Sequence, residues 1–163
     1  MKKILMVAAL MIASVAMFAQ SGRSIYQKYS DRENVSAVFI SSAMFRMIGS
    51  IPDIQVEQDS INLTPIIKSL KGLYILETSN PDIRESIVSD VNSFVESSKY
   101  ELLMEAKDSG DIVRIYTVGD DRTVESFVML ACEPDEITFI CLDGKMARDD
   151  LDAALAKATA LNK

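Results

Sequence analysis

The chain has 163 residues, with 17 basic and 24 acidic side chains and no histidine. The negative charge repels phosphate backbones and anionic lipid surfaces, so we do not expect a nucleic acid as partner. Without histidine the chain also lacks the usual general base, the Ser–His and Cys–His nucleophile pairs, and the commonest zinc ligand.

Residues 1–19 have the three parts of a secretory signal peptide: a basic start, a short apolar run and small residues at the cleavage site. The apolar run covers residues 4–18, and cleavage is expected after Ala19 or, as the alternative, after Ala16. The run is shorter than the roughly 20 residues that span a bilayer, and no cysteine lies near its end. We therefore expect a periplasmic or secreted protein that keeps no transmembrane anchor and is not a lipoprotein.

Residues 20–163 fit a single domain of ordinary size and contain no internal repeat, low-complexity run or linker. Without the signal peptide, 15 basic residues remain against 24 acidic ones, which gives a net charge of −9. The acids are spread along the chain, and solubility is the simplest reason for them.

The first half of this domain is expected to combine short helices with two strands. Helical spacing predicts a helix over residues 24–34, and a β-branched, aromatic run predicts a strand over residues 35–40. The other elements expected here are a short helix from Ser41 or Ser42 to Gly49, a loop or poorly ordered arm over 53–62, a short helix over 64–70 and a strand over 72–76.

The clearest helix of the sequence follows directly. Asn80 is a favourable N-cap, Pro81 suits the first turn, and Asp82 faces the positive end of the helix. Apolar residues recur along one side at helical spacing, and this side is expected to cover a sheet or another helix. They are Ile83, Ile87, Val91 and Phe94, with Val88 and Val95 beside them.

The second half reads as four strands followed by a closing helix. Short turns separate the strands, which predicts that consecutive strands pair as an antiparallel meander. The expected fold is therefore α+β: a mostly antiparallel sheet with a C-terminal four-strand meander, one or two earlier strands, and helices packed on it. The strands are expected over 100–107, 112–118, 124–132 and 137–142, and the helix from Asp149 or Asp150 with Leu151, Leu155, Ala158 and Leu161 on one side.

Four short segments carry a family resemblance through their order and spacing. They are Val-Phe-Ile-Ser at 38–41, Ala-Met-Phe-Arg-Met at 43–47, Leu-Tyr-Ile-Leu at 73–76 and Tyr-Glu-Leu-Leu-Met at 100–104. With them the chain resembles an uncharacterised family of exported Bacteroidetes proteins, the domain of unknown function 4252, from about Tyr29 to Leu151. The resemblance implies the periplasm or outer envelope of a Gram-negative cell. It implies no catalytic residue, because the family carries no established activity.

Two cysteines, Cys132 and Cys141, would lie in an oxidising compartment, where an even number invites a disulfide. If residues 134–135 form a two-residue turn, Cys132 faces Ile137 and Cys141 faces Val128. The two residues then lie about 13 Å apart along the strands, beyond the roughly 7 Å that a disulfide allows between Cα atoms. A three-residue loop would place them on opposite faces, so we expect free, buried thiols in either case.

The acidic turns of the meander offer one candidate calcium site. The first and third turns lie at the same end of the sheet, about 10 Å apart. Calcium needs six to eight oxygen ligands, so a weak, partly hydrated site is the most that they could form. The alternative is that acids simply make soluble turns, and no EF-hand pattern is present. The candidate ligands are Asp108, Asp111, Glu133, Asp135 and Glu136.

The last two predicted strands are apolar on both faces, whereas a sheet covered on one side alternates apolar with polar residues. We favour the interpretation that the N-terminal helices cover the second face or that these strands are central in the sheet. The alternative is a protein partner or a homodimer that binds there through an exposed apolar patch. The residues on the second face are Phe127, Met129 and Ala131 with Ile140 and Leu142.

The sequence thus predicts an exported domain of unknown function that binds a partner protein or an apolar ligand without catalysis. No catalytic residue and no cofactor is expected. The alternative is a carboxylate-based hydrolase of unknown substrate, which would need paired acids in a cleft and would be favoured by a deep pocket that holds two or more acids of raised pKa.

Overall fold

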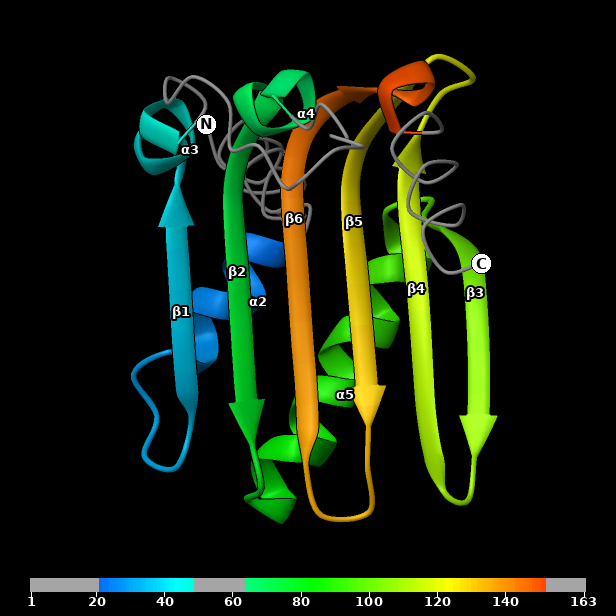
Figure 1. The fold of residues 1–163 in the computed structure, drawn as a ribbon. Coiled ribbons are helices and arrows are strands. Elements are labelled where there is room, and N and C mark those ends of the chain that lie inside the picture. Colours follow the sequence, from blue (N-terminus) through cyan, green and yellow to red (C-terminus); the bar gives the residue numbers. More distant parts are fainter. Residues whose placement is uncertain (1–20, 49–63, 152–163) are drawn as a thin grey trace, which may run out of the picture.

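The computed structural model describes residues 21–48 and 64–151, so the predicted signal peptide and the predicted arm over 53–62 lie outside the described residues. The described chain forms one six-stranded antiparallel sheet with helices packed on it, which confirms the expected α+β class (Figure 1). The strands in chain order are β1 (Ser36–Ser41), β2 (Leu70–Thr78), β3 (Glu101–Asp108), β4 (Asp111–Gly119), β5 (Thr123–Cys132) and β6 (Ile137–Ala147).

The strand order across the sheet is β1-β2-β6-β5-β4-β3. The four C-terminal strands are consecutive neighbours, which confirms the predicted meander. Strand β2 pairs with β6, and β1 pairs with β2, so the N-terminal strands extend the sheet beyond the last strand of the chain. Strands β5 and β6 are therefore the two central strands, in agreement with one of the explanations for their apolar faces.

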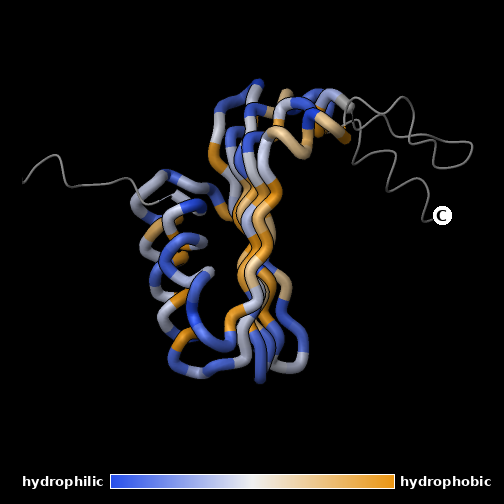
Figure 2. The backbone as a smooth tube through the Cα atoms, turned by 90° about the vertical axis from the view of Figure 1, so that its left-hand side faces the viewer, coloured by the Kyte–Doolittle hydropathy of each residue, from blue (hydrophilic) through white to orange (hydrophobic). Residues whose placement is uncertain are grey.

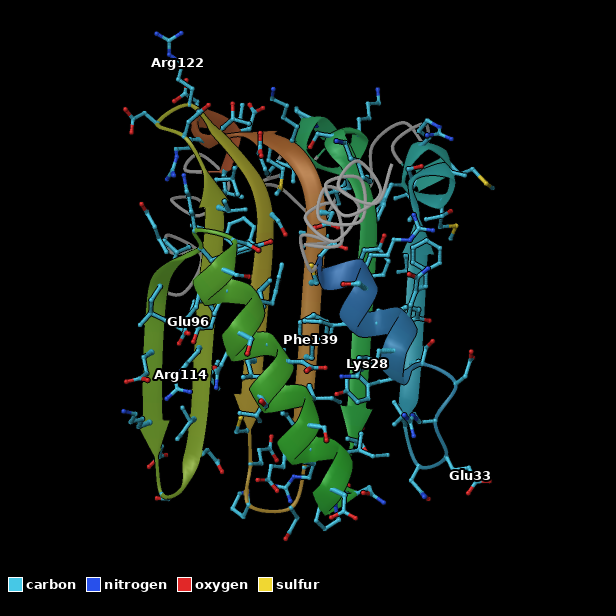
Figure 3. The ribbon with its side chains drawn as sticks, turned by 180° about the vertical axis from the view of Figure 1, so that it is seen from behind. Lys28, Glu33, Glu96, Arg114, Arg122 and Phe139 are labelled. Carbon is cyan, nitrogen blue, oxygen red and sulfur yellow. The ribbon has the colours of Figure 1, made fainter. Side chains whose placement is uncertain are left out.

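Helix α5 (Pro81–Ser97) connects β2 to β3 and crosses one face of the sheet diagonally (Figure 3). Asn80 caps it as predicted, since its Oδ1 accepts hydrogen bonds from the backbone N–H groups of Asp82 at 3.1 Å and Ile83 at 3.2 Å. The predicted apolar side of the helix faces the sheet and forms the main core with it. This core includes Ile87, Val91 and Phe94 of the helix and Leu76, Val128, Leu130 and Phe139 of the sheet.

Helix α2 (Gly22–Tyr29) lies on the same face as α5. Ser21 caps it in a capping box, in which the backbone N–H groups and side chains of Ser21 and Ser24 bond reciprocally. The helix ends at Tyr29, five residues earlier than predicted, and the chain then turns through Asn34, whose φ is 65°. Residues 31–34 are all polar, so a longer helix would have had no apolar side chain to bury there.

Helices α3 (Ser42–Ile48) and α4 (Thr64–Ser69) lie at one end of the sheet, on the side away from α2 and α5 (Figure 2). They contribute to a second, smaller cluster around Phe45, Leu70, Val124 and Met146. Residues 148–151 are helical, as expected for the start of the closing helix, and Leu151 packs against this cluster. The continuation with Leu155, Ala158 and Leu161 lies outside the described residues. No described helix is long and apolar enough to cross a membrane.

The arrangement of the helices corrects one expectation. The N-terminal helix α2 does not cover the second face of the last hairpin, because it packs beside α5 on the first face. Helices α3 and α4 reach the second face only at one end. Sequence patterns show that a helix has an apolar side, but they do not show against which face of a sheet that side packs.

Candidate interaction face

The face of the sheet opposite α2 and α5, called the second face from here on, carries one continuous row of apolar side chains. Directly paired residues of neighbouring strands point to the same side of an antiparallel sheet. Following the pairing from β1 to β3 therefore traces a row across all six strands, and each of its members is apolar. This central row consists of Val38, Ile75, Ile140, Met129, Ile115 and Met104.

The central row is only partly buried. Val38 and Met104 at its ends are 44% and 45% exposed, and the four residues between them are of intermediate exposure. None of the six belongs to either core cluster of the described residues. The neighbouring row on the first face differs sharply, since its members Leu76 and Phe139 are fully buried under the helices. Both faces are apolar in the middle of the sheet, so the difference in burial comes from the helices α2 and α5, which cover only the first face.

The four large residues predicted for the second face of the hairpin lie there as expected, with Met129 paired to Ile140 and Phe127 to Leu142. The structure divides them into two groups. Met129 and Ile140 form the middle of the central row, whereas Phe127 and Leu142 lie closer to α3 and α4 and pack against the smaller cluster. The central pair is therefore the more available part of the predicted patch.

The other four members of the central row, Val38, Ile75, Ile115 and Met104, were not predicted as part of the patch. Ile75 pairs with Ile140, and Ile115 pairs with Met129. Their alternation with inward-facing neighbours was visible in the sequence, but which strand lies beside which was not known for β1 and β2. The row appears only once the order of all six strands is established.

Polar and small side chains border the central row on the side of the β3–β4 and β5–β6 turns. The next row across the sheet contains no large aliphatic residue other than Val113 on β4. Its members are Ser36, Glu77, Thr138, Ala131, Val113 and Ala106. An apolar band with a polar border is the usual composition of a protein-binding patch.

The acidic turns lie together at one end of the sheet, as the meander predicts (Figure 1). Asp108 and Asp111 flank the β3–β4 turn, and the β5–β6 turn contains Glu133, Asp135 and Glu136. Within residues 21–48 and 64–151, however, no three side chains of the types His, Cys, Asp and Glu are grouped so as to hold a metal ion. The candidate calcium ligands are therefore near one another without forming a ligand set.

The two cysteines have the register that the two-residue turn predicts, with Cys132 opposite Ile137 and Cys141 opposite Val128. Both are free thiols, and Cys141 is buried as expected, but Cys132 is only partly buried, which corrects the expectation for that residue. Burial, followed by the nearby negative charge of Asp143, raises the pKa of Cys141, and burial also raises the pKa of Cys132. Because the thiolate is the reactive form, these raised pKa values disfavour the reactive form of both cysteines.

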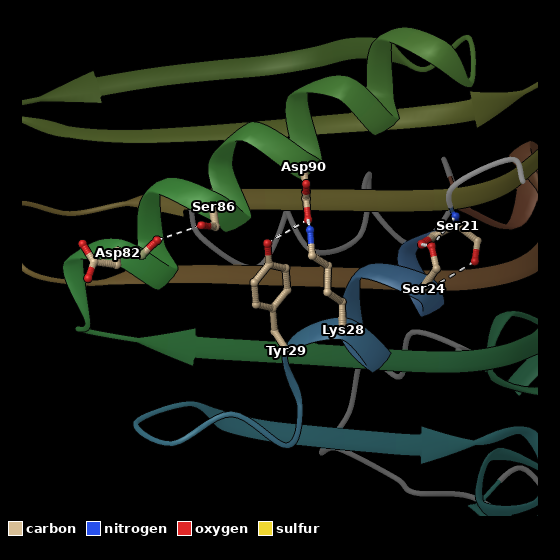
Figure 4. Close-up of polar contacts among 7 residues, drawn as sticks. All are labelled: Ser21, Ser24, Lys28, Tyr29, Asp82, Ser86 and Asp90. Carbon is tan, nitrogen blue, oxygen red and sulfur yellow. Dashed lines mark hydrogen bonds and ion pairs between the residues drawn. The ribbon is translucent and has the colours of Figure 1, made fainter. Parts of the chain in front are cut away.

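A polar cluster joins α2 to α5 on the first face (Figure 4). The Oδ2 atom of Asp90 lies 2.6 Å from the Lys28 Nζ, and the Tyr29 hydroxyl donates to the same oxygen at 2.7 Å. The hydrogen bond with Asp90 raises the pKa of Lys28. This cluster therefore links the two helices through one shared carboxylate oxygen.

A shallow groove beside α2 and α5 is lined by three carboxylates, Asp82, Glu85 and Asp90, whereas Glu105 and Asp120 have pKa values shifted away from what the hydrolase alternative needs. Hydrogen bonds from Lys107 and Arg114 lower the pKa of Glu105, and backbone N–H groups of Arg122 and Thr123 lower the pKa of Asp120. A general acid needs a shift in the opposite direction. A groove of about 580 Å³ between α5 and the last hairpin is lined by Val88, Cys132 and Ile137, and among the described residues that line it Glu85 is the one carboxylate.

Comparison with known families agrees with the resemblance seen in the sequence. The model of the family described as Domain of unknown function (DUF4252) matches residues 29–154. This match includes the central row and all six strands, and the chain belongs to this family. No curated protein and no solved structure matches it.

Proposed function

We propose that this member of the DUF4252 family is an exported, non-enzymatic domain that binds a protein partner through the central row of its second face. One observation carries the proposal: six apolar residues form an unbroken row that α2 and α5 do not cover. In the neighbouring row on the first face, the residues of the three strands β2, β6 and β5 (Leu76, Phe139 and Leu130) are buried.

The dimensions of the row favour a protein as the bound molecule. Six strands at a spacing of about 4.8 Å make the row about 24 Å wide. Small molecules bind in concave pockets that enclose most of their surface, whereas a broad row on a sheet suits the apolar side chains of another protein. Each Å² of apolar surface that a partner removes from water contributes about 25 cal/mol.

The described helices and strands are compatible with removal of the predicted signal peptide. Cleavage after Ala19 or Ala16 would leave the capping residue Ser21 and every described helix and strand intact. All described helices and strands therefore lie beyond the predicted signal peptide. A periplasmic or secreted setting also agrees with the acidic, soluble composition of residues 20–163.

A photocrosslinking experiment in living cells tests both parts of the proposal. The full chain is expressed in a Gram-negative cell with a photoreactive amino acid in place of Met129 on the second face. The matched control carries the same amino acid in place of the exposed Glu96 on α5. We expect one discrete adduct from Met129 and none from Glu96, in the periplasmic or extracellular fraction, on a chain that has lost residues 1–19. The substitution Ile140→Asp in the paired position should suppress the adduct.

Three outcomes would contradict the proposal. Equal amounts of adduct from Met129 and Glu96 would show that neighbouring proteins do not contact the second face in preference to the first. A crosslink from Met129 confined to its own chain would show that this face is closed within the molecule. A full-length chain in the cytoplasm would refute export and leave the binding face to be judged on the adducts alone.

A further inference from the structure

Within the described residues the sheet ends at two edge strands, β1 and β3, and we infer that β1 pairs with β1 of a second copy of this chain to form a dimer with a continuous sheet. An edge strand has a line of backbone N–H and C=O groups without strand partners, which is a template for another strand. This inference goes beyond the proposed partner site, because it uses the edge of the sheet and not its second face.

Strand β3 has the features by which proteins protect an edge. All of its residues are exposed, and four of the eight are charged. The pairing with β4 shifts between Leu102 and Met104, so the strand contains a bulge. Glu105 holds Lys107 and Arg114 in ion pairs of 2.7 Å each. Charges and a bulge both oppose the addition of another strand.

Strand β1 has none of these features. Its sequence, Ser-Ala-Val-Phe-Ile-Ser, contains no charged residue, and its pairing with β2 runs from Ser36 to Ser41 without a shift. Val38 is 44% exposed and Phe39 is 49% exposed. Of the two edges in the described part of the chain, β1 is the one that a further strand can join.

Phe39 adds an aromatic anchor on the first face beside this edge. Its ring stacks on Tyr74 with centroids 5.1 Å apart and an angle of 14° between the planes, and it lies 6.2 Å from the ring of Tyr26. Tyr74 is buried, yet half of Phe39 remains exposed. A strand added outside β1 would cover the exposed part of this ring.

A second copy fits this edge because β1 is self-complementary. Two copies related by a two-fold axis pair antiparallel, and opposed residues must share a face of the joined sheet. The register that uses residues 36–40 in full places Val38 opposite Val38 and the small Ala37 opposite the large Phe39. No charged side chain of β1 is opposed, so the net negative charge of the chain is not concentrated at the contact. The central rows of the two copies would then meet at Val38.

Analytical ultracentrifugation of the purified mature protein over a range of concentrations tests this inference. We expect a dimer for the natural chain, a monomer for Phe39→Lys, and a dimer for the control Leu103→Lys, which adds the same charge at the β3 edge to a side chain that is 52% exposed. Because Phe39 lies on the first face, Phe39→Lys should leave crosslinking from Met129 intact. The two proposals can therefore fail independently: sedimentation tests the dimer, and crosslinking from Met129 tests the partner site.

A cysteine crosslink tests the register and does not depend on how well Phe39→Lys folds. Opposed residues of antiparallel strands have Cβ atoms about 4.5–5.5 Å apart, close to what a disulfide needs. In a Cys132→Ser background, oxidised Val38→Cys should give a covalent dimer, and Leu103→Cys should not. A monomeric natural chain at every concentration, or equal crosslinking from both edges, would overturn the inference.

Discussion

Gly22 lies where the first turn of α2 approaches β6, and there is no room for a larger residue. A Cβ atom built at this position would overlap the Sγ atom of Cys141 and lie 2.6 Å from its Cβ atom. Both residues are buried. The glycine is therefore needed for the close approach of helix and sheet, not for an unusual backbone conformation.

The substitution Gly22→Ala should destabilise the protein by about 1–3 kcal/mol, the usual cost of overpacking a core. Helix propensity alone predicts the opposite sign, because alanine is favoured over glycine by about 1 kcal/mol within a helix. Chemical denaturation measures the difference. The double variant Gly22→Ala/Cys141→Ala should lose less stability than the sum of the two single variants, since the two positions are in contact. A stabilised Gly22→Ala would contradict this view of the α2 contact.

At the scale of elements, patterns of neighbouring residues predicted more than long-range pairings. The alternation along residues 100–142 and the short turns predicted the meander, and the structure confirms its pairing and the register of the last hairpin. The cap at Asn80 and the apolar side of α5 were equally local signals. The pairing of β2 with β6 was not predictable, because nothing within either strand specifies its neighbour.

The candidate face was predicted only in part for the same reason. Met129 and Ile140 belong to one hairpin, so their shared face followed from the turn between them. Val38 and Ile75 join the row through pairings between distant segments. The expected coverage by N-terminal helices was wrong for α2, because an amphipathic helix can satisfy its apolar side on either face of a sheet that is apolar on both.

The N-cap of α5 gives an element-scale prediction. Asn80 Oδ1 accepts two backbone hydrogen bonds at the start of the helix that carries most of the helical side of the core. The substitution Asn80→Ala removes this acceptor and should lower the free energy of unfolding by about 1 kcal/mol. Asn80→Asp retains an acceptor oxygen and is the matched control. Equal denaturation midpoints for Asn80→Ala and the natural chain would show that the cap does not stabilise the helix.

At the scale of the whole molecule, the described chain is a two-layer structure whose sheet is apolar on both sides and whose long helix covers one side (Figures 1 and 2). Domains normally bury each apolar face of a sheet against another layer. Helices α2 and α5 bury the first face in this way, and α3 and α4 bury one end of the second face. The central row is the part of the sheet that a partner protein is proposed to cover.

Methionine oxidation provides the most direct test of that claim, because the chain carries internal controls. Met129 lies in the central row, Met47 on α3 is 69% exposed, and Met146 is 1% exposed. The oxidation rate of each is measured by mass spectrometry in the purified mature protein and in intact cells. If a partner covers the second face, the oxidation rate of Met129 relative to that of Met47 is several-fold lower in cells than in the purified protein. The ratio of the rates of Met47 and Met146 is the same in both settings. Equal relative rates for Met129 in the two settings would contradict the account.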